Sequence, residues 1–236
     1  RAITVAKARS RIPRSSRSLA IKEKALGPNH LEVAGSLDDL AGILIAREKF
    51  ADAEPPCRRA IEMYRKGLGS DHPAVAATLV NLAMLCKVQG RNADAEPLYE
   101  EAIAIFEKAL GRDHPDIATP LNNLAVLLAS RGAHEAAEPL CRRSLAIRER
   151  ELGSNHPDVT NSLANLAAIY RAQGKYDAAE PVYKRLLAIR EKRYGPNHAE
   201  VAAVIESLSS LYEKSNQKDK AASCAARAAL IRAQIH

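Results

Sequence analysis

A short motif, Leu-Gly-x-x-His, recurs along this chain at a fixed interval of 42 residues, with Tyr in place of Leu in the last copy. Columns of leucine and proline elsewhere in the period keep the same phase. Agreement at several columns, without insertions, excludes coincidence. A fixed period of this length predicts a repeat architecture in which each unit packs only against its neighbours. The motif glycines are Gly27, Gly69, Gly111, Gly153 and Gly195.

Each period has the pattern of two helices, as the copy from Gly69 to Leu110 illustrates. Asp71-His72-Pro73 predicts a helix start, with the Asx or the His as N-cap and Pro at the first helical position. Gly90 is placed to end this first helix. A second helix is predicted from about Asn92, with Pro97 near its start, where a missing N–H costs little. The first helix has one apolar face, made by Val75, Leu79, Leu82, Ala83 and Cys86.

These helix pairs predict an all-α fold, a right-handed α-solenoid of helix-turn-helix repeats with a concave surface. A basic N-terminal segment at 1–26 precedes the array. It holds an incomplete repeat, whose second helix begins at about residue 12, because Ser18 to Glu23 match Ser144 to Glu149 in phase. Five complete repeats follow at 27–68, 69–110, 111–152, 153–194 and 195–236.

The net charge of +7 is confined to residues 1–26, and the remainder of the chain carries equal numbers of acidic and basic groups. Two interpretations of this segment stay open: a solvated chain end or a functional basic arm. The segment contains no aromatic residue on which bases could stack, so we expect no nucleic-acid partner. No window approaches the roughly 18 apolar residues of a membrane span, so we expect no membrane partner.

Cysteine and histidine placement argues against catalysis. The four cysteines lie within helical patterns and form no C-x-x-C pair, which predicts buried thiols in a reducing compartment and therefore a cytoplasmic protein. The recurrent histidines stand one per loop, too far apart to share a metal ion, so we interpret them as helix caps. No nucleotide-binding, hydrolase or metalloprotease motif is present. We therefore expect no enzyme activity, catalytic residue, metal or cofactor.

The repeat resembles the 42-residue tetratricopeptide repeat of kinesin light chains. The resemblance is carried by His72 to Ala83, Gly90, Ala95 to Ile105 and Leu110 to Pro115, and by the same pattern one period later. It implies a tetratricopeptide-type fold that holds an extended peptide, often acidic with a tryptophan, in a groove formed by the first helices. The family joins the kinesin heavy chain through a coiled coil; no heptad run occurs here, so that partner would require a coiled coil outside this chain.

One position between the core residues of the first helix carries Asn81, Asn123 and Asn165 in the three central repeats, with Asp39 and Ser207 at the two ends. An amide both donates and accepts, so such a ladder could hold a peptide backbone. The resemblance implies that this asparagine clamps peptides. The alternative is an asparagine that bonds only a neighbouring helix.

Four more residues project to the same side by phase: Asn122, Asn161, Lys87 and Arg171. The two cations could pair with acidic groups of a ligand. Asp38, Asp39 and Glu206 add negative charge at the two ends of the array, so the groove is not basic throughout.

The sequence thus favours a protein–protein interaction scaffold that binds a linear peptide or a partner protein, in the manner of kinesin light chain cargo or adaptor binding. The alternative is a regulatory or structural solenoid within a larger multidomain protein, of the nephrocystin type or the nucleotide-switch type. Both use the same 42-residue unit.

Overall fold

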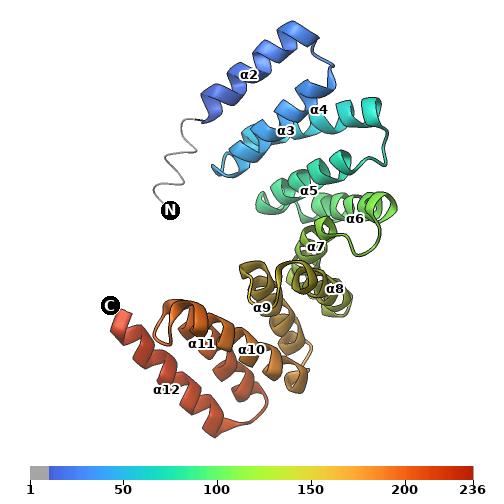
Figure 1. Cartoon of the computed structure of the whole chain (residues 1–236). Coiled ribbons are helices and arrows are strands. Elements are labelled where there is room, and N and C mark those ends of the chain that lie inside the picture. The colour runs from blue at the N-terminus through green and yellow to red at the C-terminus, as the bar shows by residue number, and fades with distance from the viewer. Residues whose placement is uncertain (1–10, 236) are drawn as a thin grey trace. The chain divides into compact units, whose positions relative to one another are not determined.

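The computed structural model describes residues 11–235, and these form helices joined by short turns, without a strand in that range (Figure 1). The first ten residues of the predicted basic segment lie outside the described residues. The α-helices are α2 (Arg11–Leu26), α3 (Leu31–Ile45), α4 (Phe50–Leu68), α5 (Pro73–Val88), α6 (Asn92–Leu110), α7 (Ala118–Ser130), α8 (His134–Leu152), α9 (Pro157–Ala172), α10 (Tyr176–Tyr194), α11 (Ala199–Lys214) and α12 (Lys218–Ile235).

The chain divides into two compact units, one up to Leu127 and one from Leu128, with the boundary inside α7. In the first unit each helix from α2 to α6 packs against the next, and α3 also contacts α5. In the second unit α8 to α12 pack consecutively in the same way. Each predicted period therefore contains a first helix and a second helix, and α2 stands as a second helix without a described partner before it.

The core is built from the faces that the sequence pattern predicts. Val75, Leu79, Leu82 and Cys86 of α5 are all at most 2% exposed. The second helix α6 adds Tyr99, which is fully buried. Burying such side chains stabilises a fold by about 1.5–3 kcal/mol each, so consecutive hairpins stack through this apolar surface.

Ion pairs join successive second helices within each unit. In the first unit Arg59 binds Glu23 at 2.6 Å, and Arg65 binds Glu101 at 2.6 Å. In the second unit Arg227 binds Glu191 at 2.5 Å. All of these partners are 36 residues apart, so the sequence period itself positions them. They are partly exposed, and pairs of this kind contribute about 0–1 kcal/mol each.

Histidine, rather than the neighbouring Asx, caps the first helices. The His72 Nδ1 accepts a hydrogen bond from the Ala74 N–H at 3.1 Å, which satisfies one of the free donors of the first turn. The same contact recurs in every complete repeat, at 3.1–3.3 Å, so the expected capping role is confirmed. The capping residues are His30, His72, His114, His156 and His198.

Each first helix ends in a turn that requires a left-handed residue. Gly90, Gly132 and Gly174 take this role, as the sequence predicts. The next N–H closes the turn, as where the Arg91 N–H donates to the Cys86 carbonyl at 2.8 Å. In the terminal repeats the same conformation is adopted by Glu48 and Asn216, each with φ of 60°.

Prolines account for two departures from the expected helices. Pro97 is the sixth residue of α6, not one of the first four, so its missing donor leaves the Ala93 carbonyl without its helical partner. Ala93 is exposed, and water can satisfy that carbonyl. In the third repeat Pro120 cannot donate to the Asp116 carbonyl. The first turn is accordingly a 3₁₀ helix, Pro115–Ile117, and α7 begins only at Ala118.

Candidate functional site: the open face of the first helices

The first helix of each pair leaves one side uncovered, which we name the open face. In the first unit it carries Asp38 and Asp39 of α3, Asn81 and Lys87 of α5, and Asn123 of α7. In the second unit it carries Asn161, Asn165 and Arg171 of α9 and Glu206 and Ser207 of α11. These side chains are half-buried or exposed, and buried core residues such as Leu82 and Leu166 lie beside them in the sequence. Helical phase therefore places these predicted residues on one side of the helices of each unit, whereas Asn122, the remaining predicted residue, is buried.

Asn81 does not stand free on this face. Its Nδ2 donates to Oδ1 of Asp38 on the preceding first helix, at 3.3 Å. Such a bond to a neighbouring helix is what the alternative interpretation of this asparagine predicts. It occupies one of the two amide N–H groups and no lone pair of the amide oxygen, so most of the hydrogen-bonding capacity remains.

The two neighbouring asparagines of α7 differ in exposure. Asn122 is 8% exposed, and it therefore offers little surface to a ligand. Asn123 is half-buried beside the fully buried Tyr99 hydroxyl. Burial raises the pKa of Tyr99 to about 12, and the adjacent Asn123 amide acts against that increase. Asn123 therefore lies close to Tyr99 of the second helix α6 and remains partly accessible.

In the second unit, Asn161 is exposed and Asn165 is half-buried. They lie one helical turn apart on α9, so they share one side of that helix. Asn161 has the most accessible amide among the predicted asparagines, although it lies outside the asparagine column.

Two cations on the open face lack a carboxylate partner among residues 11–235. Lys87 is half-buried, and that burial lowers the pKa of its amine. Arg171 donates to the Ser210 hydroxyl of α11 at 3.1 Å, which is a neutral acceptor. A half-buried cation without a counter-charge gains from pairing, so each unit presents one position suited to an acidic group.

The opposite charge lies at α3. Asp38 is half-buried and Asp39 is exposed, and neither forms an ion pair within the described part of the chain. Burial raises the pKa of Asp38, the Asp39 charge adds to that effect, and the Asn81 amide opposes it. Tyr64 of α4 also belongs to this region, since both aspartates raise the pKa of its hydroxyl. The sequence pattern alone gave no reason to select Tyr64.

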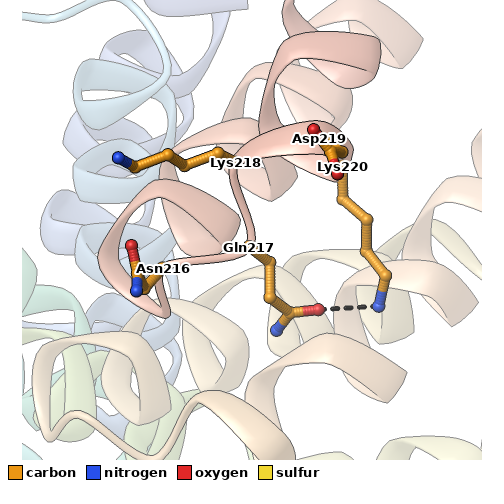
Figure 2. A pocket seen from close by; sticks show the side chains of 5 residues that line it. All are labelled: Asn216, Gln217, Lys218, Asp219 and Lys220. Atoms are coloured by element: carbon orange, nitrogen blue, oxygen red, sulfur yellow. Dashed lines mark hydrogen bonds between the residues drawn. The ribbon is translucent and has the colours of Figure 1, made fainter.

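Surface depressions also occur away from these residues within the described part of the chain, and among them are the following two. One, of about 230 Å³, lies over Leu79 and Leu82 between α4 and α6, and the Arg65–Glu101 pair borders it. The other is wide and shallow, at the turn before α12, where Lys220 Nζ donates to Gln217 Oε1 at 2.7 Å (Figure 2). None of the predicted site residues lines either depression.

Within residues 11–235, His, Cys, Asp and Glu side chains form no group of three or more that could hold a metal ion. The four cysteines are free thiols, three of them buried and Cys224 half-buried. No helix in the same range has the length and apolar character needed to cross a bilayer.

A family model described as tetratricopeptide repeat matches the chain in four overlapping windows: residues 32–108, 74–150, 116–192 and 159–232. Together these windows span nearly all of the described residues. No curated protein sequence matches the chain.

Solved structures with the same fold cover most of the chain. BtubC (BKLC) from P. vanneervenii is 25% identical, with a TM-score of 0.78 over 97% of this chain and 92% of that one. A Podospora anserina protein described as a kinesin light chain with nearly identical TPR-like repeats is 25% identical, with a TM-score of 0.75 over 88% and 98%. YrrB, described as a TPR protein with an unusual peptide-binding site, shares the fold at 14% identity, with a TM-score of 0.64 over 90% and 91%. The predicted all-α, tetratricopeptide-type solenoid class is confirmed.

Proposed function

Because this chain belongs to the tetratricopeptide repeat family, we propose that it is a protein–protein interaction scaffold whose open face binds a linear peptide or an extended segment of a partner protein. The observation that carries the proposal is that each unit has a half-buried cation without a carboxylate partner in the described range, Lys87 in the first and Arg171 in the second. Similarity to kinesin light chain-like structures and to a peptide-binding TPR protein supports it.

The open-face amides would hold the ligand backbone, while the cations bind its acidic side chains. Asn81, Asn123 and Asn165 recur at the repeat spacing, and Asn161 adds an exposed amide in the second unit. Asn122 is so buried that it offers a ligand little accessible surface. The role is cargo or adaptor binding, without catalysis and with neither a membrane nor a nucleic acid as partner. Binding to the kinesin heavy chain would require a coiled coil outside this chain.

We place this activity in the cytoplasm. The four free thiols, three of them buried in helix interfaces, suit a reducing compartment.

A selection of random linear dodecapeptides on the purified chain tests the proposal. We expect enriched peptides whose affinity falls about tenfold when Lys87 or Arg171 is changed to Glu, because like charges then meet at the interface. Lys66→Glu, an exposed lysine on α4, is the matched control and should leave affinity unchanged. Changing Asn81, Asn123 and Asn165 to Ala should weaken every enriched peptide, whatever its sequence. Peptides that bind the asparagine variant equally well would exclude the clamp.

One observation favours the second function, a regulatory or structural solenoid that packs against another domain. Leu230 of α12 is 65% exposed, and it lies on an alanine-rich helix. A failed peptide selection, together with crosslinking of this helix to a neighbouring domain in the full-length protein, would establish that function instead.

A further inference from the structure

Glu206 on the open face of α11 is neutralised from within the chain. The Arg232 guanidinium of α12 binds it through two parallel hydrogen bonds, Nε to Oε1 at 3.0 Å and Nη2 to Oε2 at 3.1 Å. This is the paired geometry by which arginine recognises a carboxylate. The last repeat therefore displays a complete carboxylate–guanidinium pair at this position.

The first repeat has the same carboxylate without the guanidinium. Asp38 occupies the position of Glu206 four periods earlier, and Tyr64 occupies the position of Arg232. Both pairs are 26 residues apart, so the repeat geometry places Tyr64 where the arginine would stand. In the intermediate repeats this column serves other contacts: it is Phe106 in the second, and in the third and fourth Arg148 and Arg190 bind Ser162 and Glu200 of the next first helix. Tyr64 therefore supplies no cation to the aspartates from the position that Arg232 uses in the last repeat.

The contacts of Tyr64 agree with this placement. A Cβ added to Gly35, one turn before Asp38 and Asp39, would lie 3.7 Å from the Tyr64 hydroxyl. The charges of both aspartates act on that hydroxyl, after burial, to raise its pKa. On the other side of the aspartates, a Cβ added to Gly42 would meet nothing within 4 Å. The surface around the two carboxylates is therefore lined by an aromatic ring and left open by glycines.

Several other carboxylates of the first unit have cationic partners from the chain. Glu23 binds Arg59, Glu101 binds Arg65, and Glu54 binds both Arg58 and Arg91. By contrast, Asp38 and Asp39 are adjacent carboxylates on the open face, and neither has a cationic partner in the described range. Two carboxylates beside an aromatic ring suit a guanidinium or an ammonium group.

We propose that the open face of the first unit selects a peptide with an arginine or lysine side chain, which binds Asp38 and Asp39 beside Tyr64 and completes the pair that Arg232 makes with Glu206. This inference rests on the proposed function and adds the polarity of its ligand. The ligand is dipolar: basic over α3 and acidic over Lys87 of α5. Lys87 lies about six residues further along its helix than the aspartate level, about 9 Å of rise, and neighbouring helices are about 9 Å apart. An extended peptide covers that diagonal in about four residues.

The test compares peptides selected from the random dodecapeptide library on the wild-type chain and on two variants. Tyr64→Arg introduces the guanidinium that Arg232 offers to Glu206 in the last repeat, so we expect the aspartates to gain a partner from within the chain. We expect wild-type peptides to be enriched in Arg or Lys at one position and to bind Tyr64→Arg about tenfold more weakly. Tyr64→Phe, the matched control, leaves the carboxylates unpaired and should keep the preference. Replacing the selected Arg by Gln should weaken binding to the wild type but not to Tyr64→Arg.

A double change, Asp38→Asn with Asp39→Asn, should remove the same preference, and it keeps the test decisive if Tyr64→Arg does not fold. Enriched peptides without a basic preference, or with equal affinity for Tyr64→Arg, would overturn this inference and leave the proposed function intact. A selection that enriches no peptide on any version of the chain would overturn both.

Discussion

The Asn81 side-chain amide donates to the Asp38 carboxylate across 3.3 Å, from one first helix to the preceding one. This bond fixes the orientation of the amide, because Nδ2 must face Asp38 and the oxygen then faces away. A peptide N–H would meet that oxygen without any rearrangement of Asn81. The same bond ties the first amide of the predicted clamp to the acidic end of the open face.

Asp38→Asn should stabilise the protein at neutral pH. Burial, followed by the charge of Asp39, raises the pKa of Asp38 above its ordinary value. A carboxyl with a raised pKa contributes stability below its unfolded-state pKa, near 4, and loses it as the pH rises through the folded-state value. At pH 7 the charged group therefore weakens the fold, whereas Asn keeps an oxygen to accept from Asn81. We expect a gain of about 0.5–1 kcal/mol, the scale of a surface-charge correction.

Urea unfolding at pH 7 and at pH 3.5 measures this effect. The gain from Asp38→Asn should be present at pH 7 and much smaller at pH 3.5, where the wild-type carboxyl is mostly protonated in both states. Glu62→Gln, an exposed carboxyl on α4, is the control and should change stability little at either pH. An equal gain at both values would contradict the charge explanation.

Glu48→Gly should also stabilise the chain, through the backbone. Glu48 has φ of 60° in the turn after α3, where Gly90 and its equivalents stand in the central repeats. A side chain in the left-handed region costs about 1–2 kcal/mol, from which the greater freedom of unfolded glycine must be subtracted. We expect a net gain of about 0.5–1 kcal/mol in urea unfolding. Gly90→Ala, the reverse change at the equivalent turn, should lose a similar amount; a gain there would contradict the interpretation.

The helices and their core were predictable from the sequence because both follow the period. Leu79, Leu82 and Cys86 are buried as the apolar pattern requires. The left-handed conformation of Glu48 was not predictable from the sequence, because no glycine stands at that position to indicate it. Pro120 was visible in the sequence, yet its effect, a 3₁₀ turn before α7, depends on which carbonyl loses its donor.

The candidate site was less accessible to sequence reasoning. Phase places a residue on a side of a helix, but it does not give the partner of that residue. Asn81 and Asp38 are 43 residues apart and meet only because consecutive first helices stack. Asn122 has the phase of the open face and is nevertheless 8% exposed. The position of Tyr64 beside Asp38 and Asp39 could be recognised only from the structure, by comparison with the contact between Arg232 and Glu206.

His72→Ala should weaken the start of α5. The His72 Nδ1 accepts from the Ala74 N–H at 3.1 Å, and alanine leaves that donor without its cap. Loss of an N-cap costs about 1 kcal/mol. His72→Asn, which can accept the same bond, should retain most of the stability. Urea unfolding of the three proteins provides the comparison, and equal loss in both variants would show that the imidazole acts by packing instead.

The thiols offer a test of the packing between hairpins. Burial raises the pKa of Cys57 and of Cys141 to about 12, and it raises the pKa of Cys86 and Cys224 as well. Since the thiolate is the nucleophile, the buried cysteines should resist alkylation at pH 8, and Cys224, the half-buried one, should react first. We expect iodoacetamide to modify Cys224 in the folded protein and all four cysteines in urea, as read by peptide mass spectrometry. Early modification of Cys57 or Cys141 would mean that neighbouring hairpins separate on the timescale of labelling. In a Cys224→Ser variant, which serves as the control, the folded protein should show almost no labelling.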